Sequence, residues 1–151
     1  MKIALINENS QAAKNELICN TLKKVVEPMG HEVLNFGMYS AEDANQLTYV
    51  QIGILTAVLI NSGAADFVIT GCGTGEGAML ACNSFPAVLC GHVESPLDAY
   101  LFSQVNDGNT ISTHFSYQRK ILLEAYESMT TIAEKEKLIH RMGNYATFYK
   151  N

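Results

Sequence analysis

The sequence has no tryptophan, only 3 prolines and few charged residues, which make up 17 % of its 151 positions. Basic side chains are the scarcer kind, 10 against 15 acidic ones, and the longest basic run is Lys23-Lys24. Binding of nucleic acid needs clustered Lys and Arg, so the composition argues against that class of protein. A surface with so few charges instead favours contact with another subunit.

Two further absences concern the cell compartment. The apolar stretch Val50–Ile60 is too short to span a bilayer, and the apolar start Met1–Ile6 is ended too early by Asn7-Glu8-Asn9 to be a signal peptide. No C-x-x-C pair is found among the cysteines, which are Cys19, Cys72, Cys82 and Cys90. Zinc binding has little support from such spacing. We therefore expect a cytoplasmic protein with free thiols, no metal and no membrane association.

Apolar residues are plentiful, at 48 % of the chain, and strand-like runs alternate with segments of helical periodicity up to residue 112. The expected strands are Met1–Asn7, Glu32–Phe36, Phe67–Thr70, Ala87–Cys90 and Thr110–Ser112. The expected helices are Gln11–Met29 with Ser10 as cap, Tyr49–Asn61, Ala78–Ser84, and Pro96–Val105 with Ser95 as cap. This alternation predicts a three-layer, doubly wound (Rossmann-like) α/β fold with a five-stranded parallel sheet.

Beyond the last expected strand the sequence becomes more polar, and helices are expected over Phe115–Tyr126 and Thr131–Met142. We interpret residues 1–151 as a single domain. An α/β core of residues 1–115 would carry a helical tail, residues 116–151, that packs at a subunit interface.

The strongest chemical signal is Gly71-Cys72-Gly73-Thr74-Gly75-Glu76-Gly77, which is expected between a buried strand and a helix. Because its glycines lack side chains, successive backbone N–H groups can point at one anion, helped by the positive end of the following helix. The segment lacks the Gly-Lys-Ser/Thr of a Walker loop and the spacing of a dinucleotide fingerprint. A tight strand-to-helix turn without a ligand is the simpler alternative.

Cys72 gives this loop a reactive group. A thiol just before a helix N-terminus lies where thiolate character is favoured, and Thr74 adds a hydroxyl. A thiolate base beside several amides suits proton transfer next to a carbonyl through an enediolate. The same groups fit nucleophilic acyl transfer, although no His or Asp is placed locally to activate the thiol. Otherwise Cys72 is a small buried apolar residue, as expected for the other cysteines.

Six short motifs follow one another at a characteristic spacing. They are Met1–Ile6, Asn35–Ser40, Ser62–Asp66, Cys72–Gly77, Ala81–Pro86 and Asn106–Asn109. Over about residues 1–115 they resemble the family of type B ribose-5-phosphate isomerases and galactose-6-phosphate isomerase subunits, enzymes of pentose phosphate and galactose metabolism.

The resemblance implies aldose–ketose isomerisation of a sugar or sugar phosphate without a metal or organic cofactor. The family's cysteine, matched by Cys72, moves a proton between C1 and C2 of the open-chain sugar, and its threonine, matched by Thr74, assists at the substrate oxygens. Further family positions hold the developing charge; the matching residues are Gly73, Gly75, Gly77 and Asn106. Family members are dimers or tetramers with sites built across subunits, so a homodimer or homotetramer is expected.

The sequence departs from this family where the sugar ring is opened and the phosphate is bound. The family's Asp-His falls on Glu8-Asn9, which we expect to contact the substrate, and its Asp-Tyr-Pro element falls on Asn45-Gln46-Leu47. The ring-opening histidine falls on Val105, and the phosphate-binding arginines have only His140-Arg141 as a loose counterpart. These changes indicate an isomerase with an altered substrate, phosphorylated or not. The alternative is a catalytically impaired sugar- or phosphate-binding subunit that pairs with a paralogue in a heteromeric isomerase.

Three further side chains are candidates for the site. His92 and His114 follow the fourth and fifth expected strands, and open α/β sheets bind ligands at that edge; either could replace the missing ring-opening base. Glu76 projects from the glycine loop as an additional acid or base. The simpler interpretations are two loop histidines with local partners and a carboxylate favoured by the helix dipole.

Overall fold

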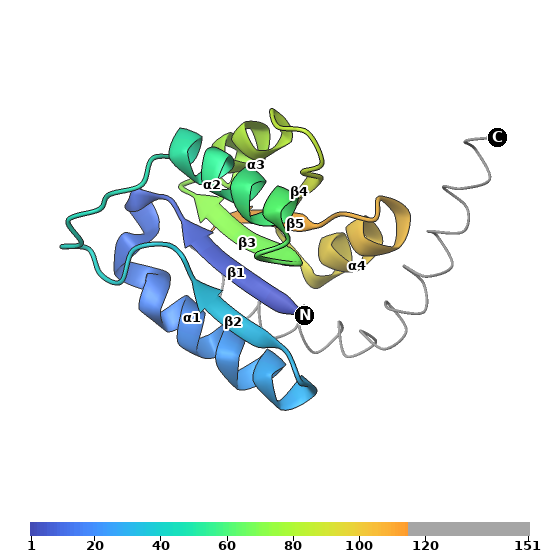
Figure 1. Ribbon diagram of the computed structural model, residues 1–151, viewed down its shortest axis with the longest axis horizontal. Coiled ribbons are helices and arrows are strands. Elements are labelled where there is room, and N and C mark those ends of the chain that lie inside the picture. The colour runs from blue at the N-terminus through green and yellow to red at the C-terminus, as the bar shows by residue number, and fades with distance from the viewer. Residues whose placement is uncertain (115–151) are drawn as a thin grey trace.

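In a computed structural model, residues 1–114 are described, and they form a five-stranded parallel sheet with helices on both faces (Figure 1). The strands are β1 (Lys2–Asn7), β2 (Glu32–Asn35), β3 (Phe67–Cys72), β4 (Cys90–Val93) and β5 (Thr110–His114). The helices are α1 (Ala12–Val26), α2 (Tyr49–Ser62), α3 (Glu76–Asn83) and α4 (Pro96–Val105), and 3₁₀ turns at Asn9–Gln11 and Glu27–Met29 flank α1. The predicted α/β fold is confirmed. The expected tail helices lie outside the described residues.

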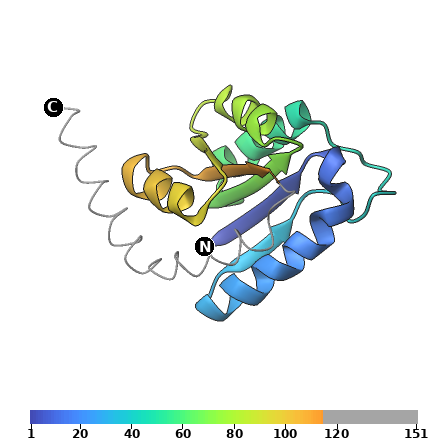
Figure 2. The same ribbon diagram turned by 180° about the vertical axis from the view of Figure 1, so that it is seen from behind.

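The strands divide their side chains between two apolar layers. Ile3 and Leu5 of β1 pack with Leu22 of α1 and with α4, whereas Ala4 and Ile6 pack with residues of α2 and α3. Figure 2 shows α1 and α4 together on the face of the sheet to which Ile3 and Leu5 point. Side chains of a strand alternate between faces, so the middle of a strand covered on both sides is apolar, as residues 3–6 of β1 are. In the part of the chain that the structure describes, no helix is long and apolar enough to cross a membrane.

The chain changes direction across the sheet between β1 and β3. The strand order is β2-β1-β3-β5-β4, so β1 leads outward to β2 on one side and β3 leads toward β4 on the other. Such a switch point opens a crevice at the carboxyl ends of the two strands. Asn7 pairs with Gly71 in register, and the N–H of Glu8 donates to Gly71 O at 3.0 Å. The segments that follow β1 and β3 therefore lie side by side at this edge.

Two local predictions are wrong. The fourth strand is Cys90–Val93 rather than Ala87–Cys90, because Ala87 has a φ of 63°, which no strand accommodates. Ser10 does not cap the first helix. Its hydroxyl donates to the Glu8 carboxylate, and the N-cap position is held by Gln11, whose side chain makes no capping hydrogen bond.

The start of α4 follows the prediction. Ser95 accepts a hydrogen bond from Asp98 N, and the Asp98 side chain accepts one from the N–H of Ser95, with Pro96 in the first turn. This reciprocal capping box satisfies two N–H groups that the helix itself leaves unpaired. The helix therefore begins at the residue where the sequence places it.

Candidate active site

Cys72 is the last residue of β3 and lies at the carboxyl edge of the sheet. The residue is 8 % exposed and packs in one apolar cluster with the buried residues Ile52 and Ala78. The N–H of Gly75 donates to Cys72 Sγ at 3.2 Å. A backbone N–H and the start of a helix both stabilise negative charge that develops on sulfur. The thiol is thus buried like a core residue, and the loop beside it supplies a hydrogen-bond donor to its sulfur.

The other three cysteines lie in apolar clusters away from the glycine loop. Burial raises the pKa of the Cys19 thiol. A hydrogen bond with Cys82, together with burial, raises the pKa of Cys90. Among residues 1–114, no three or more His, Cys, Asp or Glu side chains gather where they could hold a metal ion. The hydrogen bond with Cys90 lowers the pKa of Cys82, which is fully buried beside Cys90 and away from the glycine loop. Of the four cysteines, Cys72 is the one that ends β3 and leads into the glycine loop.

Gly77 and Tyr49 form one wall around the thiol. A methyl group placed on Gly77 would lie 3.8 Å from Cys72 Sγ and 3.8 Å from ring carbons of Tyr49. The sequence patterns did not single out Tyr49. The available signal was its position directly after Thr48, the N-cap of α2, because helices that follow parallel strands begin at the carboxyl edge of the sheet.

Glu8 and Asn9 follow β1 at the same edge. The Glu8 carboxylate accepts hydrogen bonds from the N–H of Ser10 at 3.1 Å and from the Ser10 hydroxyl. Asn9 is exposed, and its backbone N–H donates to Leu47 O at 2.7 Å. A methyl group built on Gly73 would lie 4.0 Å from Ser10 Oγ. The Ser10 hydroxyl therefore lies near the glycine loop on the β1 side, with the Glu8 carboxylate bound to it.

Side chains from β4 and β5 meet the loop from the other side. His92 Nε2 lies 3.0 Å from Thr74 O, and Ser112 Oγ donates to Gly75 O at 2.6 Å. His114 Nδ1 contacts Gly73 O. The structure places His92 and His114 beside the loop, as expected. In each, a ring nitrogen contacts a backbone carbonyl oxygen of the loop.

Thr74 and Glu76 are the exposed side chains of the loop. Thr74 Oγ1 accepts a hydrogen bond from the N–H of Glu76 at 3.3 Å. Glu76 is in the first turn of α3, where the helix dipole favours a carboxylate. Both side chains have a local structural role and are exposed at the carboxyl edge of the sheet.

Asn106 is not brought to Cys72 within the chain. It follows the last residue of α4 and precedes β5, whose first residue pairs with Val68 and whose last residue, His114, pairs with Cys72. A strand of this length spans roughly 13 Å at about 3.3 Å per residue, so Asn106 and Cys72 lie at opposite edges of the sheet.

The rest of the Asn106–Asn109 motif is structural. A methyl group on Gly108 would overlap the ring of Phe102. Asn109 donates to Ala87 O at 2.7 Å and accepts from Leu89 N at 2.9 Å. These contacts fasten the segment before β4 to the start of β5.

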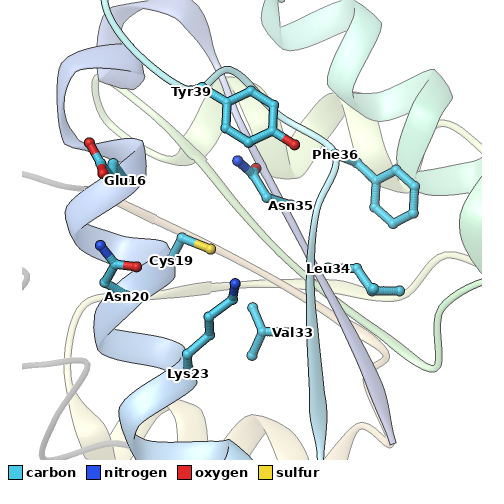
Figure 3. A pocket seen from close by; sticks show the side chains of 9 residues that line it. All are labelled: Glu16, Cys19, Asn20, Lys23, Val33, Leu34, Asn35, Phe36 and Tyr39. Atoms are coloured by element: carbon cyan, nitrogen blue, oxygen red, sulfur yellow. The ribbon is translucent and has the colours of Figure 1, made fainter.

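A cavity of about 580 Å³ lies away from Cys72, between α1 and the edge strand β2 (Figure 3). Cys19 and Lys23 project into it from α1, and Tyr39 borders it beyond the end of β2. It is lined by Glu16, Cys19, Asn20, Lys23, Val33, Leu34, Asn35, Phe36 and Tyr39. None of the predicted catalytic or binding residues contributes to this cavity.

The fold and the crevice define a class, an open parallel α/β sheet with a thiol and a glycine loop at its switch point. A family model described as Ribose/Galactose Isomerase matches residues 3–131. The chain belongs to the ribose/galactose isomerase family, and it is therefore an enzyme of the aldose–ketose isomerase class. The resemblance carried by the sequence motifs is confirmed.

Similar solved structures have different named substrates. A 4-deoxy-L-threo-5-hexosulose-uronate ketol-isomerase, complexed with a tartrate, is 52 % identical with a TM-score of 0.83, over 99 % of this chain and 75 % of that one. A ribose-5-phosphate isomerase from Vibrio parahaemolyticus is 47 % identical with a TM-score of 0.77, over 83 % of this chain and 60 % of that one. The present chain thus spans less than two thirds of the Vibrio protein. Ribose-5-phosphate isomerase B from Clostridium thermocellum, 23 % identical with a TM-score of 0.73, shares the fold.

Proposed function

We propose that the protein interconverts an aldose and a ketose through a cis-enediolate, with Cys72 as the base, and that its substrate is an open-chain sugar acid. The observation that carries the proposal is the Cys72 thiol at the end of β3, with the N–H of Gly75 3.2 Å from its sulfur. Membership of an isomerase family supplies the reaction class. A proton that moves between adjacent carbons requires no organic cofactor or metal.

The proposed chemistry is a pair of balanced proton transfers. The Cys72 thiolate removes the proton from C2 of the aldehyde, the C1–C2 double bond forms, and negative charge moves to the carbonyl oxygen on C1. The same thiol then delivers a proton to C1, while a proton passes from the C2 hydroxyl to the C1 oxygen, leaving a ketone at C2. Backbone N–H groups of the loop, at Gly73 and Gly77 among others, would stabilise the enediolate.

The polar side chains around the crevice would handle the substrate oxygens. We assign the transfer between the two oxygens to Glu8 with its partner Ser10, whose hydroxyl lies near the loop on the β1 side. Thr74 and Asn9 would bind substrate hydroxyls, and Glu76 would border the open side. A carboxylate is suited to shuttling a proton of this kind because it accepts and donates with little rearrangement.

The substrate named for the 52 % identical relative accounts for the departures from the sugar-phosphate pattern. A 4-deoxy-5-hexosulose uronate has a ketone at C5 and no hydroxyl at C4. Its C1 aldehyde lacks the two hydroxyls that close ordinary five- and six-membered sugar rings, so no ring-opening group is needed. Valine at position 105 then carries no penalty. The substrate also bears a carboxylate in place of a phosphate. A phosphate-binding arginine is therefore not required, and the sequence contains no arginine before Arg119.

Turnover of two substrates tests the proposal. Isomerisation of 4-deoxy-L-threo-5-hexosulose uronate and of ribose 5-phosphate can be followed by proton NMR. We expect kcat/KM for the uronate to exceed that for ribose 5-phosphate by about 100-fold or more, the size of one missing acid–base contribution. A preference for ribose 5-phosphate would contradict the substrate assignment. Turnover of neither compound would favour the sugar-binding subunit of a heteromeric isomerase.

A further inference from the structure

We propose that His92 and Ser112, supported by His114, are positioning residues that act on the catalytic side chains through single peptide groups of the glycine loop. Each binds one loop carbonyl and so orients the N–H of the same peptide group. The importance of this orientation for catalysis rests on the proposed function. The coupling itself can be measured without substrate.

Three successive carbonyls are bound from the β4–β5 side. Gly73 O contacts His114, Thr74 O lies 3.0 Å from His92 Nε2, and Gly75 O accepts from Ser112 Oγ at 2.6 Å. In a trans peptide group the N–H points away from the C=O. The N–H groups that belong to these three carbonyls therefore point away from β4 and β5, toward the crevice.

Two of these N–H groups donate to side chains that the proposed reaction uses, Cys72 as the base and Thr74 as a contact to substrate hydroxyls. The peptide group held by His92 carries the N–H of Gly75, which donates to Cys72 Sγ at 3.2 Å. The peptide group held by Ser112 carries the N–H of Glu76, which donates to Thr74 Oγ1 at 3.3 Å. A donor at the carbonyl polarises the peptide and strengthens the hydrogen bond at its other end. His92 thereby orients and strengthens the contact to the base.

Gly75 makes this close approach possible. Its φ is 83°, and a methyl group on it would lie 2.8 Å from His92 Nε2 and 2.8 Å from the carbonyl carbon of Thr113. Any side chain would push the loop off the two strands. The absence of a side chain at this position thus serves the contact with β4 and β5 as well as the turn itself.

The geometry also determines which ring nitrogen carries hydrogen. A carbonyl oxygen only accepts, so His92 must present Nε2–H and His114 must present Nδ1–H to the loop. The Glu94 carboxylate, 3.9 Å from His92 Nε2, is the charged group nearby. A nitrogen that donates to a carbonyl does not serve as a general base. His92 therefore supports the thiol instead of replacing the ring-opening histidine.

Four variants test the proposal. His92→Leu removes the donor, His92→Gln keeps an N–H at nearly the reach of Nε2, and Ser112→Ala removes the second donor. Ser84→Ala is the matched control, because Ser84 Oγ also donates to a carbonyl, Leu80 O at 2.9 Å, outside the site. The substrate-free readout is hydrogen exchange of the Gly75 amide by NMR, and the catalytic readout is kcat and KM with the uronate.

For His92→Leu we expect the Gly75 amide to exchange about tenfold faster, the worth of one hydrogen bond, and kcat to fall by about tenfold or more with KM within about twofold. His92→Gln should restore both within about threefold, and Ser84→Ala should change neither. Unchanged Gly75 exchange in His92→Leu, or a Gln variant as impaired as the Leu variant, would overturn the proposal. If Ser112→Ala fails to fold, the partly exposed His92 still decides the question. Faster Gly75 exchange in a protein that isomerises nothing would retain the coupling and reject the isomerase function.

Discussion

At the residue scale, the chemistry around Cys72 is set mainly by the backbone. Its sulfur receives a peptide N–H from Gly75, and a glycine, Gly77, leaves the space beside it open. The placement of Cys72, Glu8, His92 and the glycine loop at one edge could be predicted, because the carboxyl ends of parallel strands can be located in the sequence. The atoms they contact could not, since those contacts depend on loop geometry that no local pattern specifies.

Gly77→Ala should separate stability from activity. Gly77 is inside the first turn of α3, and the added methyl group would make an ordinary 3.8 Å contact with Cys72 Sγ and with Tyr49. Replacing a helical glycine by alanine stabilises by about 0.5–1 kcal/mol, so Tm should stay level or rise. The methyl group would occupy the space beside the sulfur, so kcat/KM should fall by about tenfold or more, a loss of roughly 1.4 kcal/mol in transition-state stabilisation.

Thermal melts and steady-state kinetics check this prediction. Thr21→Ala, in α1 and away from the crevice, is the control, because it raises helix propensity without adding an atom near the thiol. Wild-type kcat/KM in Gly77→Ala would show that the open space beside Cys72 has no catalytic role.

At the element scale, alternating strands and helices predict the whole sheet, and most boundaries are correct within a few residues. Strand β4 is the exception. Ala87–Cys90 has the apolar character of a buried strand, but Asn109, a residue distant in the sequence, holds Ala87 and Leu89 outside the sheet. A tertiary contact thus overrides local propensity. The Ser10 cap failed for a local reason, because Ser10 lies inside the 3₁₀ turn Asn9–Gln11 and α1 begins only after Gln11.

At the scale of the whole molecule, one chain does not bring together all residues that the family resemblance assigns to the site. Cys72 lies beside the carboxyl end of β5, whereas Asn106 precedes its amino end, at the opposite edge of the sheet. If both serve one site, Asn106 must come from a second copy. This arrangement fits the expectation of sites built across subunits.

Mixing inactive variants tests this arrangement. Cys72→Ala and Asn106→Ala should each be impaired alone. In mixed dimers formed by co-refolding, one of the two sites would carry neither change. Random pairing makes half of the dimers mixed, so activity should recover to about a quarter of the wild-type value. If mixtures shown to contain mixed dimers recover no activity, the arrangement is contradicted. Either Cys72 and Asn106 then act within the same chain, or Asn106 is not part of the site.

The most direct test of Cys72 as the base is isotope exchange. In D₂O, the wild-type protein should introduce deuterium at the carbon that receives the proton during turnover of 4-deoxy-L-threo-5-hexosulose uronate. Cys72→Ala, which removes the base while the fold is retained, should lower the rate of isomerisation with exchange by about 10²–10⁴-fold, the usual contribution of a general base. A folded Cys72→Ala protein that isomerises and exchanges at the wild-type rate would contradict the assignment.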